Sequence, residues 1–269
     1  MPSPAPPHLT SVANPRVTAA VSLRDRRDRE RTGLTLIDGA RELRRALDCG
    51  VEIVEAFVCE PLLAGPDAQT VEGCARVLGT TIRPTTEQVL AKVAFGQRSE
   101  GLVAVARIPT TELTALALPD DALVVVIDGV EKPGNLGAVL RSADGAGADA
   151  AIAASPRTDL FNPNTIRASA GTVFAVPLAA APAPEVLAWL RARGFRIVTA
   201  RVDAAASYTD TDLTGQLAIV LGAEADGLTE MWTGADIEPV RLPMLGVADS
   251  LNVSVSAAVL LYESRRQRG

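Results

Sequence analysis

The stretch that decides the fold is residues 125–148, VVIDGVEKPGNLGAVLRSADGAGA. An aliphatic strand ends at Asp128, a loop with Pro133 and Gly134 follows, and a helix begins near Asn135. The helix turns one apolar face to a sheet, at the spacing of an amphipathic helix: Leu136, Val139, Leu140 and Ala143. Arg141 is turned away from this face. A cation on the open side of the first helix after a strand is well placed to meet a phosphate, as is the helix N-terminus.

A plain strand–helix turn with a solvated arginine is the alternative, because the stretch is neither GxGxxG nor a P-loop. Strands and helices alternate on both sides of it. The expected strands are 123–128, 149–154, 172–176, 196–201, 217–222 and 239–243, and the expected helices are 135–146, 163–170, 184–193 and 250–266. This alternation predicts an α/β fold with a mostly parallel sheet, in which ligands bind at the carboxyl ends of the strands.

A smaller α/β unit is expected in front, over residues 21–108. Its elements are the strand 33–38, a helix over 39–49 that ends at Gly50, the strand 52–59, helices near 66–78 and 86–93, and the strand 101–108. Residues 109–121 are expected as a linker, and residues 1–20, rich in Pro and Ala, as a flexible tail. The remaining domain spans 122–269.

Composition excludes several classes of protein. The single histidine, His8, argues against histidine catalysis and a histidine metal site, so no metal is expected. Three cysteines without CxxC spacing indicate reduced thiols. The longest aliphatic run, 122–127, is too short to cross a bilayer, and no signal peptide is evident, which favours a cytoplasmic protein. The net charge of −6 still permits a local basic patch that binds RNA.

A second motif lies in residues 217–229, LAIVLGAEADGLT. An apolar strand stops at Gly222, and Glu224 follows in a loop that Gly227 closes. A glycine at the end of a strand permits close approach by a ligand. A solvated turn glutamate is the competing interpretation.

A third motif lies in residues 240–256, VRLPMLGVADSLNVSVS. A strand ends at residues 242–244, and a helix begins at about Ser250. We expect its buried face to hold Leu251, Val255, Ala258, Val259 and Tyr262. Four polar side chains crowd the start of this apolar helix, where one cap would suffice: Ser250, Asn252, Ser254 and Ser256. This excess of polar side chains indicates that the start of the helix binds a group other than its own backbone.

Together, the motifs at 135–141, 222–227 and 242–254 resemble those of the SpoU family, the TrmH-like RNA ribose 2′-O-methyltransferases. Residues 33–50, GLTLIDGARELRRALDCG, resemble the L30e-like substrate-binding domain of ribosomal-RNA members. The resemblance implies a C-terminal deep trefoil knot, S-adenosylmethionine as cofactor, and a homodimer in which one active site takes residues from the other subunit.

The resemblance also implies roles for individual residues. The cofactor would contact Gly222, Leu242, Met244 and Leu251. The catalytic group would consist of Asn135, Arg141, Glu224, Ser250 and Asn252. In this group Arg141 stabilises the developing 2′-alkoxide; whether it also acts as a base is left open, because an arginine is nearly always protonated.

RNA would be bound by a basic stripe of the front unit: Arg24, Arg26, Arg27, Arg29, Arg31, Arg41, Arg44 and Arg45. A solvated, salt-bridged face is the alternative, because acids are interleaved with these arginines. Residues 98–105, RSEGLVAV, depart from the Pro-Gln-Gly often found there in relatives, which leaves the identity of the substrate open.

The expected activity is methylation of a ribose 2′-hydroxyl in large-subunit (23S) ribosomal RNA. A transfer-RNA methyltransferase and a ribosome-methylating resistance enzyme are alternatives within the class. A non-catalytic RNA-binding assembly factor would show decay at Asn135, Arg141 or Asn252, and none is present. A nucleotide-dependent oxidoreductase would need GxGxxG after the first strand, and GNLG does not match.

Overall fold

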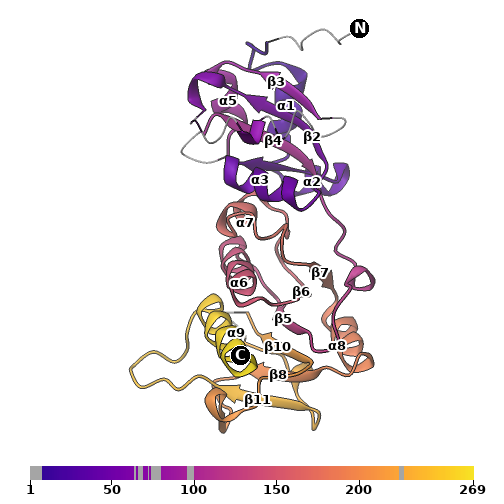
Figure 1. Cartoon of the computed structure of the whole chain (residues 1–269), viewed down its shortest axis with the longest axis vertical. Coiled ribbons are helices and arrows are strands. Elements are labelled where there is room, and N and C mark those ends of the chain that lie inside the picture. Colours follow the sequence, from indigo (N-terminus) through magenta and orange to yellow (C-terminus); the bar gives the residue numbers. More distant parts are fainter. Residues whose placement is uncertain are drawn as a thin grey trace. The chain divides into compact units, whose positions relative to one another are not determined.

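The computed structural model describes residues 8–63, 65, 69–71, 73, 80–95, 100–223 and 227–269. Figure 1 labels its helices and strands. The chain divides into two compact units: the first holds residues 1–109 with 161–175, and the second holds 110–160 with 176–269. Segment 161–175 therefore packs with the first unit, although its neighbours along the chain belong to the second. The helix expected near 66–78 lies mostly outside the described residues.

The first unit contains a four-stranded sheet in the order β1-β4-β2-β3. Its strands are β1 (Leu34–Asp38), β4 (Leu102–Arg107), β2 (Ile53–Val58) and β3 (Thr81–Pro84). The β4 strand pairs antiparallel with β1 and β2, and β3 adds parallel to β2. Its helices are α1 (Pro15–Ser22), α2 (Arg26–Thr32), α3 (Ala40–Asp48), α5 (Glu87–Val93) and α7 (Pro163–Ala168), and a 3-10 turn, η1, spans Glu60–Leu62.

The N-terminal segment is part of the core of this unit. Leu9 bridges to Thr85, and Val17 and Ala20 on α1 are buried in a cluster that includes residues of α5. The side chain of Asn14 accepts a hydrogen bond from the Arg16 amide at 2.9 Å and so caps α1. The expected flexible tail over 1–20 is therefore wrong for residues 9–20, because their apolar side chains cover α5.

The second unit contains a seven-stranded sheet in the order β7-β6-β5-β10-β8-β11-β9, with every pairing parallel. Its strands are β5 (Leu123–Asp128), β6 (Ala150–Ala154), β7 (Leu178–Ala181), β8 (Arg196–Ala200), β9 (Ala206–Ser207), β10 (Leu217–Leu221) and β11 (Ile237–Arg241). Its helices are α6 (Pro133–Ala146), α8 (Ala183–Ala192) and α9 (Val253–Arg268), with 3-10 turns η2 (Leu113–Ala115), η3 (Tyr208–Asp210) and η4 (Glu230–Trp232). The prediction of a mostly parallel α/β sheet is confirmed.

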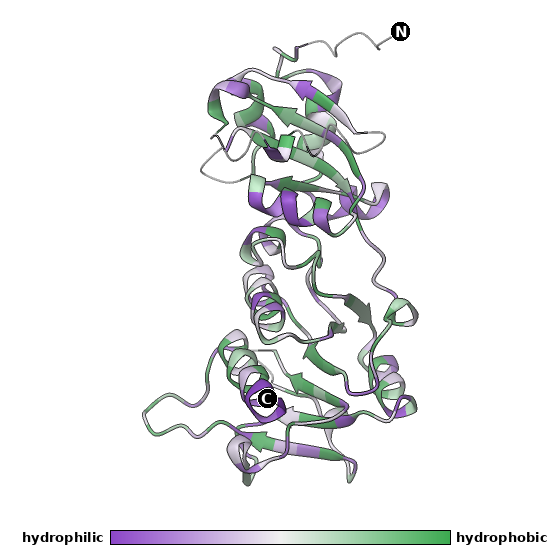
Figure 2. Ribbon diagram, in the orientation of Figure 1, coloured by the Kyte–Doolittle hydropathy of each residue, from purple (hydrophilic) through white to green (hydrophobic). Residues whose placement is uncertain are grey.

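The central strands of this sheet are buried on both faces. Every residue of β5, β6 and β10 is buried, as expected for parallel strands covered by helices, and these strands are largely green in Figure 2. The α8 helix covers one face, and α6 and α9 pack together on the other. These central strands therefore leave only their ends open to a ligand.

The strand expected at 172–176 is wrong. Residues 169–175 form turns, with Ala170 and Gly171 at φ of 53° and 84°. The Ser169 hydroxyl accepts hydrogen bonds from the Gly171 and Val173 amides at 3.2 and 3.3 Å. A side chain that satisfies nearby backbone amides in this way competes with pairing in a sheet.

The C-terminal helix begins later than expected and buries another face. It starts at Val253, capped by Asn252, rather than at Ser250. Its buried residues are Val253, Ala257, Leu260, Leu261 and Ser264. The expected face is wrong, because Leu251, Val255 and Tyr262 are exposed. The helix is apolar on two sides, and packing on α6 and β10 selects one of them.

Candidate active site

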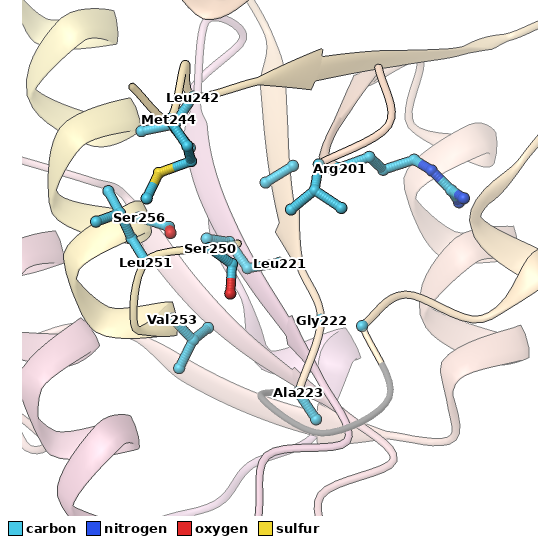
Figure 3. Close-up of a pocket in the computed structure, with 13 residues that line it drawn as sticks. Arg201, Leu221, Gly222, Ala223, Leu242, Met244, Ser250, Leu251, Val253 and Ser256 are labelled. Atoms are coloured by element: carbon cyan, nitrogen blue, oxygen red, sulfur yellow. The ribbon is translucent and has the colours of Figure 1, made fainter. Parts of the chain in front are cut away.

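A cavity of about 380 Å³ lies at the carboxyl ends of β8, β10 and β11 (Figure 3). The start of α9 closes one side of it. This is the edge of a parallel sheet at which ligands bind in α/β proteins. Its lining is mostly apolar, with a few polar groups: Ala200, Arg201, Val202, Leu221, Gly222, Ala223, Gly227, Leu242, Met244, Ser250, Leu251, Val253 and Ser256.

The structure brings the four predicted cofactor-binding residues to this one cavity. Gly222 follows β10, Leu242 and Met244 follow β11, and Leu251 precedes α9. They come from three loops separated along the chain, and Figure 3 shows their side chains around the same space. Their contact with a cofactor stays a prediction.

Gly222 is required by the chain itself. A Cβ atom at this position would lie 2.2 Å from the carbonyl carbon of Gly227 and 2.5 Å from the amide nitrogen of Leu228. Ala223 and Gly227 form an antiparallel bridge, and the Gly227 amide donates to the Ala223 carbonyl at 3.0 Å. The close approach predicted from this glycine is therefore an approach between two backbone segments of the cavity wall.

Asn135 and Asn252 connect the first and third motifs. The side-chain amide of Asn252 donates to Asn135 Oδ1 at 3.4 Å. Asn252 Oδ1 accepts from the amide nitrogen of Ser254 at 2.9 Å and from its hydroxyl at 2.6 Å. One side chain thus caps α9 and reaches the start of α6. The carboxamide donor and the cap acceptor are different atoms, so the two roles can be separated by substitution.

The other predicted catalytic residues are placed differently. Ser250 lines the cavity. Arg141 is exposed on α6 and lines neither this cavity nor the smaller one of about 80 Å³ that shares Ala223 and Val253 with it. Glu224 lies outside the described residues.

Sequence reasoning named Ser256 as part of the polar helix start but gave it no role in the site, and it missed the loop after β8. Ser256 lies on the first turns of α9 and faces the cavity (Figure 3). Residues 200–202 line the opposite side, where Arg201 turns outward in an ion pair with Asp203 at 3.0 Å. The rule that ligands meet the carboxyl ends of strands would have found this loop, because it follows β8 directly.

Among the residues that the structure describes, Arg26, Arg31 and Arg41 of the predicted RNA-binding set form ion pairs with neighbouring acids. These pairs are Arg26–Glu30 at 2.6 Å, Arg31–Asp28 at 2.7 Å and Arg41–Glu42 at 2.7 Å. The interleaved acids thus produce the salt-bridged contacts that the alternative interpretation expects. The Arg26–Glu30 and Arg31–Asp28 pairs are largely exposed, and such pairs contribute little to stability and can exchange partners, whereas Glu42 of the third pair is buried.

Arg29 and Arg45 donate hydrogen bonds to backbone carbonyls of the protein. Arg29 is 1% exposed, and its Nη1 donates to the carbonyls of Leu23 and Arg24 at 2.7 and 2.8 Å. Arg45 donates to the Ala170 carbonyl at 2.6 Å. The burial of Arg29 removes it from any surface that RNA contacts.

The rest of the arginine set is exposed. Arg24 donates to the Lys92 carbonyl at 2.9 Å, Arg44 to the Thr70 hydroxyl at 3.4 Å, and Arg27 lies on the solvent side of α2. Within the described part of the chain, no His, Cys, Asp and Glu residues cluster as a metal site. Nor does any helix there have the length and apolar character needed to span a membrane.

Residues 122–262 match the SpoU rRNA Methylase family, and residues 14–104 match the MRM3-like substrate binding domain. The 23S rRNA (uridine(2479)-2′-O)-methyltransferase of Streptomyces viridochromogenes is 32% identical over 259 residues, which cover 91% of this chain and 87% of that protein.

Two solved structures are similar over nearly the whole chain. An RNA 2′-O ribose methyltransferase superposes with a TM-score of 0.85 and 42% identity, covering 97% of this chain and 99% of its own. An AdoMet-bound rRNA methyltransferase from Sinorhizobium meliloti has a TM-score of 0.87 and 28% identity, covering 97% of each chain. The predicted family is confirmed: this chain belongs to the SpoU rRNA methylase family.

Proposed function

We propose that this protein transfers a methyl group from S-adenosylmethionine to a ribose 2′-hydroxyl of 23S ribosomal RNA. The observation that carries the proposal is the cavity at the strand ends, which lies beside the bonded pair Asn135–Asn252. The similar methyltransferase of Streptomyces viridochromogenes, named for a uridine of 23S rRNA, supports this substrate.

The cavity fits the cofactor. About 380 Å³ lies in the range of pockets for small organic ligands, and its walls combine aliphatic side chains with the hydroxyls of Ser250 and Ser256. When bound there, S-adenosylmethionine supplies a methyl group already activated by the sulfonium charge.

Asn135 and Asn252 are placed to orient the target nucleotide. Asn135 and Lys132 line the smaller cavity, which shares Ala223 and Val253 with the larger one. A ribose held at this junction would have its 2′-oxygen next to the cofactor site. Fixing two reactants in this way can contribute roughly 7–11 kcal/mol to lowering the barrier.

A homodimer would explain why Arg141 lies outside both cavities of its own chain. This arginine lines neither cavity of its own chain, so we propose that it serves the active site of a second copy, where it stabilises the developing alkoxide. The face of α9 that was expected to be buried is exposed at Leu251, Val255 and Tyr262, next to the fully exposed Leu245 and Val247. An apolar stripe of this kind suits a partner helix.

Light scattering at micromolar concentration tests the dimer. The expected mass is twice the 28.0 kDa of one chain. A Val255→Asp variant should shift the mass to that of a monomer and abolish transfer, because each active site would then lack Arg141 of the other copy. A monomeric wild-type protein with full activity would contradict the dimer.

We further propose that residues 21–108 recognise RNA, that 109–121 connect this domain to the methyltransferase domain 122–269, and that the segment after β10 forms the trefoil knot. The predicted arginines that are not buried would contact the phosphates, with Arg29 left out because it is buried: Arg24, Arg26, Arg27, Arg31, Arg41, Arg44 and the half-buried Arg45. The site of action would be the cytoplasm.

The test is transfer of label from S-adenosylmethionine to unmodified ribosomal RNA and to bulk transfer RNA, offered side by side. Label should enter ribosomal RNA and be lost with Arg141→Ala, while Arg193→Ala, on an exposed arginine at the end of α8, should keep full activity. Label in transfer RNA alone would move the assignment to that substrate. Binding of the cofactor without transfer of label to either RNA would contradict both substrate assignments, ribosomal RNA and transfer RNA.

A further inference from the structure

Asp128 ends β5, the first strand of the second unit, and is not exposed to either cavity. The residue is 6% exposed, and its Oδ2 accepts a hydrogen bond at 2.9 Å from Nε1 of Trp232, which is fully buried. Asp128 is absent from the lining of both cavities. A carboxylate at the carboxyl end of a parallel strand is a natural candidate for catalysis, but this one faces the core instead.

Trp232 is the last residue of η4, which follows directly on the loop after β10. That loop supplies Gly222, Ala223 and Gly227 to the cavity. On its way to η4 it also places Leu228 against the core cluster that contains Trp232. The hydrogen bond therefore fixes the far end of a segment whose near end is the cavity wall.

The start of the loop after β10 lies against β5, the strand that Asp128 ends. Ile127 pairs with Leu221 in the β5–β10 register, so Asp128 and Gly222 are the next residues of the two strands. A Cβ atom on Gly129 would lie 3.7 Å from that of Ala223. The end of β5 thus lies beside the start of the loop at Gly129 and holds the end of the loop through Asp128.

Packing alone does not explain a carboxylate here. The other five residues of β5 are aliphatic, and an aliphatic residue would fill the position without loss of hydration. Burial raises the pKa of Asp128, while the indole hydrogen bond and Arg157 act in the opposite direction. A buried hydrogen bond with defined geometry selects one arrangement of the groups that it joins.

We propose that Asp128 and Trp232 are a positioning pair that sets the wall formed by Gly222, Ala223 and Gly227 and thereby the affinity for S-adenosylmethionine. The pair acts through the loop and touches neither the cofactor nor the RNA. This inference rests on the proposed cofactor site.

The test compares Asp128→Asn, which keeps an oxygen acceptor for the indole, with Asp128→Leu, which removes it. Isothermal titration with S-adenosylmethionine should give a Kd within twofold of wild type for the first variant and at least about fivefold weaker for the second. Hydrogen exchange at the Gly227 and Leu228 amides should rise in the leucine variant, while exchange in β5 stays low.

A double-mutant cycle of Asp128→Leu with Trp232→Phe distinguishes an effect on cofactor affinity from an effect on protein stability alone. Asp128→Leu and Trp232→Phe should each weaken cofactor binding. The double variant should have a Kd no higher than that of the single variant with the higher Kd, because both changes remove the same hydrogen bond. Additive effects would overturn the pair, as would a lower Tm with an unchanged Kd in Asp128→Leu. If that variant fails to fold, equal affinity of wild type and Trp232→Phe overturns it. Failure of the wild type to bind the cofactor would refute the proposed function rather than the pair.

Discussion

Replacing Gly222 by alanine should damage cofactor binding more than any other single methyl addition in the cavity. The new Cβ would lie 2.2 Å from a backbone carbon of Gly227, whereas ordinary contact begins near 3.4 Å. The opposing backbone must therefore retreat by about 1 Å. Backbone has no alternative rotamer to adopt, so the whole wall moves.

Overpacking of this kind costs about 1–3 kcal/mol, and a wall displaced from the cofactor loses at least tenfold in Kd, about 1.4 kcal/mol. Isothermal titration with S-adenosylmethionine measures the Kd, and thermal unfolding measures the stability. Gly134→Ala is the matched control, because a Cβ there meets nothing within 4 Å and alanine suits the first turn of α6. Unchanged affinity in Gly222→Ala would refute the reasoning that this backbone contact shapes the cavity.

Three further changes test other parts of the account. Asn252→Ala should lower stability by about 1 kcal/mol through loss of the α9 cap, whereas Asn252→Asp should keep the cap, and both should lose methyl transfer because they lack the amide that reaches Asn135; equal stability of the two variants, or full activity of Asn252→Asp, would contradict this division. Ser256→Ala should weaken cofactor binding roughly fivefold, the effect of one hydrogen bond of about 1 kcal/mol, without a change in Tm. Hydrogen bonds from Arg266 and Gln267 lower the pKa of Glu263 from 4.5 to about 2. Its contribution to stability is therefore present above pH 4.5 and lost as the pH falls to about 2, so Tm should fall less over this range in Glu263→Gln than in the wild type.

The sequence predicted most of the second unit correctly because its signals are local. Asp128 ends β5, Gly222 follows β10 and Leu242 follows β11, and a parallel sheet collects such strand ends at one edge. The positions of the predicted cofactor residues around one cavity follow from this rule together with the family motifs.

The errors arose where tertiary packing decides. On α9 two stripes satisfy helical periodicity, and Val255 and Ala257 are equally good candidates for burial until α6 is in place. Arg29 reads as part of a basic run, yet its guanidinium satisfies carbonyls of the preceding turn. Val17 lies in a segment whose proline and alanine content indicates disorder, and only its contact with α5 overrides that composition.

The most direct test of the central claim is the chemical identity of the product. Unmodified 23S ribosomal RNA should be incubated with the protein and methyl-labelled S-adenosylmethionine, digested to nucleosides and analysed by mass spectrometry. The account predicts label in a single 2′-O-methylnucleoside, absent with Gly222→Ala at limiting cofactor. Label on a base, or no label in RNA while the cofactor binds, would contradict it.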